Sequence, residues 1–263
     1  MFRLTDVVKH LLIINVLVFI ADQIVGLDFL ALYYPTSPNF QPFQVVSHFF
    51  MHGDLTHLLF NMFSLFMFGR FLEELWGPKK FLLFYIFCAL GGAFLHTAAN
   101  FYEIYSLEQA VMAFQAAPSH SAYFDFFNNH EEIKQIMTAY GADQYKEIAQ
   151  SLKNNLGEAP QMSSAFIQNL AQGYNQGIAS IPMVGASGAI FGLLLGFGLM
   201  FPEMEFFPIP FKAKIFVPIL MIIELSLGMN ATAGDNIAHF AHIGGALFGM
   251  ILLLLWRKTG DLD

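Results

Sequence analysis

The sequence predicts an all-α polytopic membrane protein with six transmembrane helices and a polar helical insert. Hydrophobic residues make up 56% of the 263 residues and charged residues only 12%, about half of the charge that a soluble domain carries. Several apolar runs approach the length of about 20 residues that crosses a bilayer. Outside the insert, Lys and Arg are confined to alternate connections between these runs, which is typical of membrane proteins. Lipid is therefore the expected solvent.

Six apolar runs are the expected membrane spans. They cover residues 11–27, 58–72, 81–99, 181–201, 215–229 and 237–256. The third and the fourth contain no Asp, Glu, Lys or Arg, and the fifth contains only Glu224. The second is short and polar at its start, which predicts that it faces protein or water there.

The positive charges predict the orientation of these spans. Nine Lys and Arg residues lie at the connections: Arg3, Lys9, Arg70, Lys79, Lys80, Lys212, Lys214, Arg257 and Lys258. All nine fall on one side of the membrane if the spans alternate, whereas the opposite loops 28–50 and 230–236 contain none. Because cytoplasmic loops carry the excess of Lys and Arg, we expect a cell-membrane protein with both termini in the cytoplasm.

The chain is expected to divide into three segments: residues 1–100 with spans one to three, 101–180, and 181–263 with spans four to six. The middle segment, which we call the insert, carries eight acidic residues against three lysines. Its apolar residues recur at helical spacing, as in Ile133-Ile136-Met137-Tyr140. We therefore expect extracytoplasmic amphipathic helices, with a loosely ordered acidic loop as the alternative.

Charge and cysteine content argue against nucleic acid as a partner and against disulfide or cysteine metal sites. The formal net charge is −8, whereas nucleic-acid binding needs a clustered basic face. The single cysteine, Cys88, lies in an apolar run, so neither a disulfide within the chain nor a cysteine metal site is possible.

Polar residues at membrane depth are functional candidates, because ionisable groups are costly there unless they are paired or hydrated. The candidates are His48, His52, His57 and Asn61 around the start of the second span, Ser187 at the head of the fourth, His239 and His242 at the head of the sixth, and Glu224 in the fifth. The second, fourth and sixth spans all descend from the extracytoplasmic side, so His57, Ser187 and His242 are expected near one face. A hydroxyl and an imidazole at one depth are what a Ser–His nucleophilic pair requires.

Glycines at a spacing of four predict close packing of the spans that carry this pair. Gly188, Gly192 and Gly196 repeat in the fourth span, and Gly245 and Gly249 repeat in the sixth. Small residues at this spacing let two helices approach closely in lipid, which would bring a short serine side chain to an imidazole. Taken alone, the stretch GASGAIFG is better explained by helix packing without chemistry.

The second span offers hydrogen-bond donors for a tetrahedral intermediate. His57 and Asn61 are four residues apart, so they share one helical face, and an oxyanion needs donors already in place. The alternative interpretation of His48, His52 and His57 is a metal cluster. A zinc hydrolase of this kind would carry H-E-x-x-H on one helix, and the sequence has no such run. We expect neither a metal nor a cofactor.

Four stretches of the sequence are specific when they occur together: SHFFMHGDLTHLLFNMFSLFMFG, FLEELWGPKKFLLFY, GASGAIFG and AHFAHIGGALFGM. They resemble the rhomboid family of intramembrane serine proteases, and the resemblance covers residues 43–100 and 181–256. It implies a compact six-helix bundle with a catalytic site in a water-filled cavity below the outer surface. Two features depart from the family: Phe43-Gln44 stand where a Trp-Arg pair is often found, and the insert is atypical.

The resemblance also implies roles for the matching residues. Ser187 resembles the nucleophile and His242 the general base. His57 and Asn61 match the residues that stabilise the oxyanion together with the backbone N–H of Ser187. The supporting matches are Gly185 two residues before the serine, His52 in the first loop, Glu73 near the cytoplasmic end of span two, and the packing glycines Gly245 and Gly249.

The expected function is that of an endopeptidase that cleaves transmembrane proteins through an acyl-enzyme, with such substrates and the lipid bilayer as its partners. A catalytically inactive rhomboid-like protein that binds membrane clients is the alternative. A proton-relay transporter would be expected to have repeated halves, which the sequence lacks. We expect Glu224 to lie too deep to reach the layer of Ser187 and His242, to bond a neighbouring helix, and to be dispensable for proteolysis. His239 is expected to be dispensable as well. The insert is expected to lie at the mouth of the site and to influence substrate access, and an inert spacer is the alternative.

Overall fold

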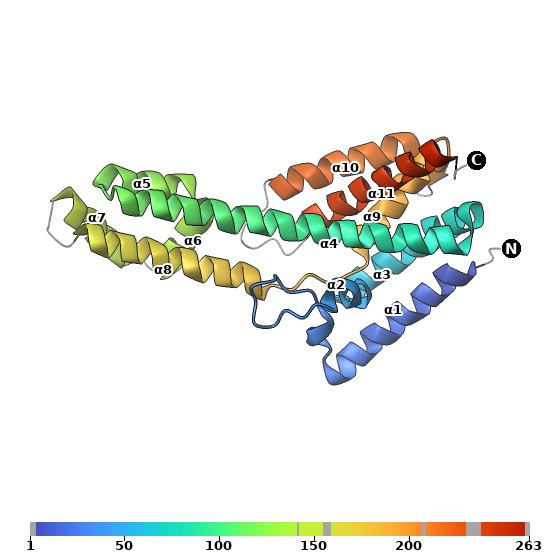
Figure 1. The fold of residues 1–263 in the computed structure, drawn as a ribbon, viewed down its shortest axis with the longest axis horizontal. Helices are drawn as coiled ribbons and strands as arrows, with labels where there is room; N and C mark the ends of the chain where they lie inside the picture. Colours follow the sequence, from blue (N-terminus) through green and yellow to red (C-terminus); the bar gives the residue numbers. More distant parts are fainter. Residues whose placement is uncertain (1–3, 141, 155–158, 207–208, 230–237, 261–263) are drawn as a thin grey trace. The chain divides into compact units, whose positions relative to one another are not determined.

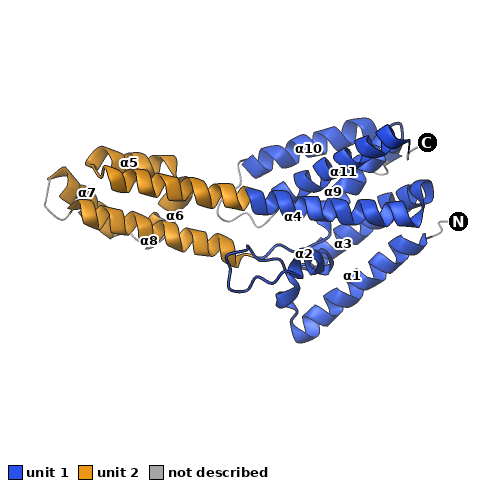
Figure 2. Ribbon diagram, in the orientation of Figure 1, with its two compact units in different colours: residues 1–98, 182–231, 235–263 blue, residues 99–181, 232–234 orange. Residues whose placement is uncertain are grey.

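The computed structural model describes residues 4–140, 142–154, 159–206, 209–229 and 238–260, and most of these residues are helical (Figure 1). A two-stranded antiparallel hairpin is the only sheet among them. The expectation of an all-α protein is thereby confirmed. The chain forms two compact units (Figure 2). Unit 1 comprises the described residues before 99 and after 181, and unit 2 comprises residues 99–181.

Unit 1 contains the apolar helices. Its elements are α1 (Asp6–Val25), η1 (Asp28–Leu30), α2 (Gln44–Ser47), η2 (His48–Phe50), α3 (Leu55–Ser64), the π-helix η3 (Leu65–Gly69), the first part of α4 (Arg70–Ala116), α9 (Ser187–Met200), β1 (Glu205–Phe206), β2 (Ile209–Lys212), α10 (Ala213–Met229) and α11 (His239–Thr259). Helix α9 is central, since it packs against α3, η3, α10 and α11.

Three helical stretches among the described residues are long and apolar enough to cross a membrane: Asp6–Val25, Leu55–Ala116 and His239–Thr259. Ser187–Met200 is apolar but shorter. The long middle stretch is broken at Gly77, whose φ of 78° favours glycine, and Pro78 follows as a good first residue of a new helix. It therefore contains two helices. The count of six spans remains a prediction.

Large apolar side chains are exposed on the outside of unit 1. Ile24 of α1 is 75% exposed, Phe60 of α3 is 70% exposed and Ile222 of α10 is 66% exposed. Soluble monomers rarely expose extended apolar surface, whereas lipid covers it without cost. Together with the apolar helices, this surface supports a multi-pass membrane protein.

Helix α1 is held at its N-terminus by a buried carboxylate. The side chain of Glu73 accepts hydrogen bonds from the backbone amides of Val7 and Val8, at 2.9 Å each, and it is only 4% exposed. The first amides of a helix have no partner within the helix, and a negative charge is favourable there. Glu73 thus joins the start of α4 to α1.

Glycines bring the backbones of α9 and α11 into direct contact, as the glycine spacing predicts. A Cβ atom added at Gly245 would lie 1.8 Å from the carbonyl oxygen of Gly188. One added at Gly192 would lie 2.3 Å from Sγ of Cys88, and one at Gly249 would lie 3.1 Å from the same sulfur. Gly245 and Gly192 have room for hydrogen only, whereas the contact at Gly249 is tight but yielding. At Gly245, α9 and α11 meet backbone to backbone.

The connection between α9 and α10 carries an exposed charge cluster. The carboxylate of Glu203 accepts a hydrogen bond from Nζ of Lys212 at 2.7 Å and another from Lys214. These two ammonium groups hold the pKa of the Glu203 carboxyl at about 2. Glu203 is therefore ionised at every physiological pH.

Unit 2 is a helical unit with a core of its own. It contains the rest of α4 with α5 (His120–Asn129), α6 (Glu131–Tyr140), α7 (Ala142–Lys153) and α8 (Ala159–Ser180). Its core includes Leu107, Phe114, Tyr123, Phe127, Ile133 and Ile148. Helices α4 and α8 are joined by a hydrogen bond between Gln115 and Gln168 at 3.0 Å and by one from Tyr174 to Glu103. The described part of residues 101–180 is thus largely helical, and its role as an insert outside the membrane stays a prediction.

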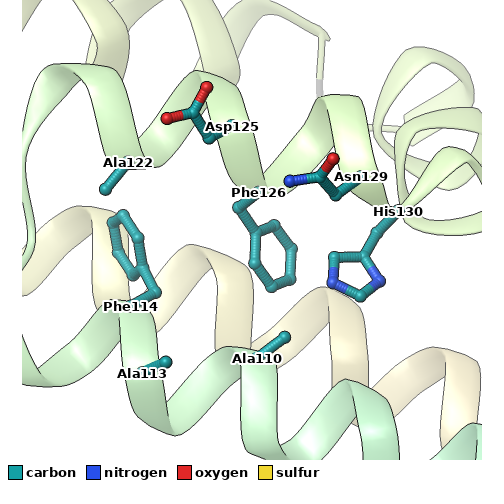
Figure 3. A pocket seen from close by; sticks show the side chains of 8 residues that line it. All are labelled: Ala110, Ala113, Phe114, Ala122, Asp125, Phe126, Asn129 and His130. Carbon is teal, nitrogen blue, oxygen red and sulfur yellow. The ribbon is translucent and has the colours of Figure 1, made fainter.

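Unit 2 also has a pocket between α4 and α5 (Figure 3). Phe114 and Phe126 form its apolar part, and Asp125 and His130 are among its polar lining groups. Three alanines in the lining leave the space that larger side chains would fill. None of these residues belongs to the motifs that predict chemistry.

Candidate active site

Ser187 is the first residue of α9. The segment that precedes it is held by the first loop of unit 1, which is the connection between α1 and α3 (residues 26–54). Met183 exchanges two backbone hydrogen bonds with Leu32, at 2.8 and 2.9 Å, and the amide of Gly185 donates to the carbonyl of His48 at 2.9 Å. Gly185 has a φ of 113°, which side chains other than hydrogen rarely allow. The half-buried Ser187 therefore follows a turn that depends on glycine.

His57 and Asn61 of α3 lie against this turn. A Cβ atom at Gly185 would lie 2.7 Å from both Cε1 and Nε2 of His57, and 3.6 Å from Nδ2 of Asn61. Asp54 caps the helix that carries them, since its carboxylate accepts from the amide of His57 at 2.8 Å. The structure thus brings both residues next to the N-terminus of α9.

The amide of Asn61 is a buried donor that is free to bind a ligand. Asn61 is only 5% exposed, and its Nδ2 has no hydrogen-bond partner among the described residues. A buried donor without a partner costs about 1–3 kcal/mol, which is tolerated where a bound group will accept the bond. An oxyanion that forms at the head of α9 would be such a group.

His52 and His48 support the site from the first loop. The ring of His52 contacts that of His57 edge to face, with centroids 5.1 Å apart. His48 is 1% exposed, and its Nδ1 is 2.8 Å from the carbonyl of Gln44. His48, His52 and His57 are not among the described clusters whose ligand atoms converge as a metal site requires.

Gln44 anchors the first loop, a role that the sequence analysis missed. It is fully buried, and its Nε2 donates to the carbonyls of Phe29 at 3.0 Å and Asn39 at 2.9 Å. Its Oε1 accepts from the amide of Gln41 at 3.0 Å. Gln44 occupies a position of the Trp-Arg pair that this chain lacks, so the departure from the family pattern was the available signal.

His242 lies one turn into α11, and its ring is stacked on Phe191 of α9. The ring centroids are 4.1 Å apart, and the planes are inclined by only 4°. Phe191 follows Ser187 by one helical turn, so both lie on the same face of α9. A Cβ atom at Gly188 would lie 3.3 Å from the carbonyl oxygen of Ala241. The two helices therefore meet at the level of Ser187 and His242, and Phe191 fixes the plane of the imidazole.

Glu224 lies in this layer, and the expectation that it lies too deep to reach His242 is wrong. Its Oε2 is 2.8 Å from Nδ1 of His242 and 2.7 Å from Nδ1 of His239. The reason is the direction of the two helices: Glu224 lies about one turn before the end of α10 at Met229, and His242 lies about one turn after the start of α11. The expectation that Glu224 bonds a neighbouring helix is confirmed.

The family model described as the rhomboid domain matches residues 39–113 and 158–259, which include His57, Asn61, Ser187, Glu224 and His242. The chain belongs to the rhomboid family. The resemblance that its motifs predict is thereby confirmed. This rhomboid protein is 38% identical over 65 residues to Rhomboid-like protease 3 of Toxoplasma gondii, with 25% of each chain covered. It is 34% identical over 85 residues to an uncharacterized mitochondrial rhomboid protein of Schizosaccharomyces pombe, with 29% of this chain and 22% of the relative covered. The alignments thus span about a quarter of the length of these relatives.

Proposed function

We propose that this rhomboid protein is an intramembrane serine endopeptidase that cleaves transmembrane proteins. The hydroxyl of Ser187 attacks the scissile carbonyl, and His242 accepts its proton and returns it to the leaving amine. The acyl-enzyme on Ser187 is then hydrolysed by water. No step requires a cofactor.

The arrangement of donors around the head of α9 carries this proposal. His57 and Asn61 lie against Gly185, and the amide of Asn61 has no partner among the described residues. The backbone N–H of Ser187 and the positive end of the α9 dipole also lie at this N-terminus. An oxyanion formed by attack of Ser187 would meet these donors already in position, which is worth about 2.7–4 kcal/mol for a single donor.

The membrane arrangement is part of the proposal. Six spans with both termini in the cytoplasm put Ser187, His57 and His242 near the extracytoplasmic face, and the insert on the same side. The distribution of nine Lys and Arg residues supports this orientation.

A fluorophosphonate probe tests the proposed nucleophile. The purified protein in detergent should react with the probe, and Ser187→Ala should remove the reaction. Ser64→Ala is the matched control, because Ser64 is another half-buried serine of unit 1, and it should label like the wild type. A folded wild type that does not react would favour an inactive rhomboid-like protein, and labelling of Ser187→Ala would assign the reaction to another residue.

A further inference from the structure

We propose that Glu224 is a positioning residue for the general base, a proposal that rests on the proposed function. Its carboxylate keeps His242 protonated at Nδ1, so that the lone pair of Nε2 is available for the proton of Ser187. The site would then work as a Ser–His–Glu triad in which the third member comes from α10.

The chemistry of the carboxylate determines the tautomer of both histidines. An ionised carboxylate can only accept hydrogen bonds, and Oε2 of Glu224 lies 2.8 Å from Nδ1 of His242. Nδ1 must therefore carry the proton, and in a neutral imidazole Nε2 is then the acceptor. A base that takes a proton from serine needs this tautomer, and a carboxylate holds it in the Ser–His–Asp triads.

The position of the imidazole is fixed from two directions. Phe191 stacks on its face at 4.1 Å between centroids, which fixes the plane of the ring. Glu224 bonds its Nδ1 edge, which fixes the rotation within that plane. The Nε2 edge is therefore turned away from α10.

His239 holds the carboxylate in place. Its Nδ1 is 2.7 Å from the same Oε2, and its ring is inclined by 85° to that of His242. Both partners are buried, with 3% of the His239 side chain and 12% of the Glu224 side chain exposed. One turn further along α10, a Cβ atom at Gly228 would lie 3.1 Å from Cβ of His239. The close approach of α10 and α11 at Gly228 allows this bond.

Glu224, His239 and His242 also form the described group whose ligand atoms could converge on a metal. The distances favour hydrogen bonds. Two ligand atoms about 2.0–2.1 Å from a tetrahedral zinc lie about 3.3 Å apart, whereas the two nitrogens lie 2.7 and 2.8 Å from Oε2. These are ordinary lengths for charge-assisted hydrogen bonds.

Substitution of Glu224 by Gln separates a positioning role from a structural one. Gln has nearly the same shape, but its amide can donate to Nδ1 of His242 and so favours the tautomer that cannot accept the serine proton. The rate of fluorophosphonate labelling per folded molecule should fall at least about 100-fold in Glu224→Gln. Glu224→Asp keeps a carboxylate and should label faster than Glu224→Gln. Glu203→Gln removes an exposed carboxylate outside the site and should label at the wild-type rate.

A structural role predicts the opposite order, with Glu224→Gln close to wild type and Glu224→Asp impaired, and that result would overturn the proposal. If wild type labels but Glu224→Gln labels equally fast, only the role of Glu224 is wrong. If the folded wild type does not label at all, the proposed function fails and this inference fails with it. Loss of wild-type labelling in a chelator, with recovery on addition of Zn²⁺, would make the three groups metal ligands and contradict the proposal.

A second measurement does not depend on the folding of a variant. In wild-type protein carrying ¹⁵N-histidine, the ring-nitrogen resonances should show His242 protonated at Nδ1 and unprotonated at Nε2. A spectrum with the proton of neutral His242 on Nε2 would overturn the proposal.

Discussion

The contact between α9 and α11 predicts that alanine substitution destabilises the protein far more at Gly245 than at Gly249, one turn further along α11. Gly245→Ala would place a Cβ atom 1.8 Å from the carbonyl oxygen of Gly188. Because Cβ atoms essentially never come closer than 3.0 Å to such an atom, the helices must separate by about 1.2 Å, the difference between these distances. At Gly249 the nearest atoms are the side-chain ends of Phe84 and Cys88, at 3.0 and 3.1 Å. These can give way by a few tenths of an ångström.

The expected magnitudes follow from these distances. Overpacking costs about 1–3 kcal/mol, and the upper end applies at Gly245 because a backbone oxygen cannot change rotamer. Alanine regains about 1 kcal/mol of helix propensity, so Gly245→Ala should lower the free energy of unfolding by about 2 kcal/mol and Gly249→Ala by less than about 1 kcal/mol. The separation also moves His242 relative to Ser187, and a misplacement of about 1 Å can cost about 100-fold in rate.

Thermal unfolding in detergent and the rate of fluorophosphonate labelling measure both effects. Gly245→Ala should unfold about 4–8 °C below wild type and label far more slowly, whereas Gly249→Ala should stay near wild type in both assays. Equal unfolding temperatures and equal labelling rates for the two variants would refute the reasoning, because the two contacts would then not differ in cost.

Two further predictions concern the edges of the site's scaffold. Glu73→Gln replaces the carboxylate that caps α1 and should lower the free energy of unfolding by about 1–2 kcal/mol. Glu74→Gln changes an exposed neighbour and should have no effect in the same thermal assay. Equal stability of both variants would contradict the capping role. Replacing residues 105–176 by a short Gly/Ser linker should leave labelling of Ser187 intact but change which membrane proteins are cut. Unit 2 has a core of its own, and a short linker can connect the ends of the deletion because α4 and α8 are hydrogen-bonded there, from Tyr174 to Glu103. Loss of labelling in the folded deletion variant would make the insert part of the catalytic core, and unchanged cleavage of several substrates would make it an inert spacer.

Motifs and helical periodicity were sufficient for the helical fold class and the family. The glycine spacing also predicted the contact of α9 with α11. These inferences succeed because they depend on local patterns in the order of the residues. The expectation that Ser187, His57 and His242 lie near one face of the membrane depends on the alternation of six spans and stays a prediction.

The expectation for Glu224 failed although the expected span 215–229 ends where α10 ends, at Met229. Glu224 lies five residues before that end, about 7.5 Å along the helix, and His242 lies three residues after the start of α11 at His239, so the two side chains can share one layer. Phe191 escaped attention because a phenylalanine in an apolar helix carries no signal of its own, and Gln44 was noted only as a departure from the family pattern. Their importance comes from contacts with residues that are distant in the sequence.

The central claim is that Ser187 is a nucleophile activated by His242. Peptide mass spectrometry after reaction with a fluorophosphonate tests it most directly, because it locates the adduct. We predict one adduct, on the peptide that contains Ser187, at full occupancy in the wild type and at most a trace in His242→Ala of equal thermal stability. An adduct on another residue, or an equal yield on Ser187 without His242, would contradict the account.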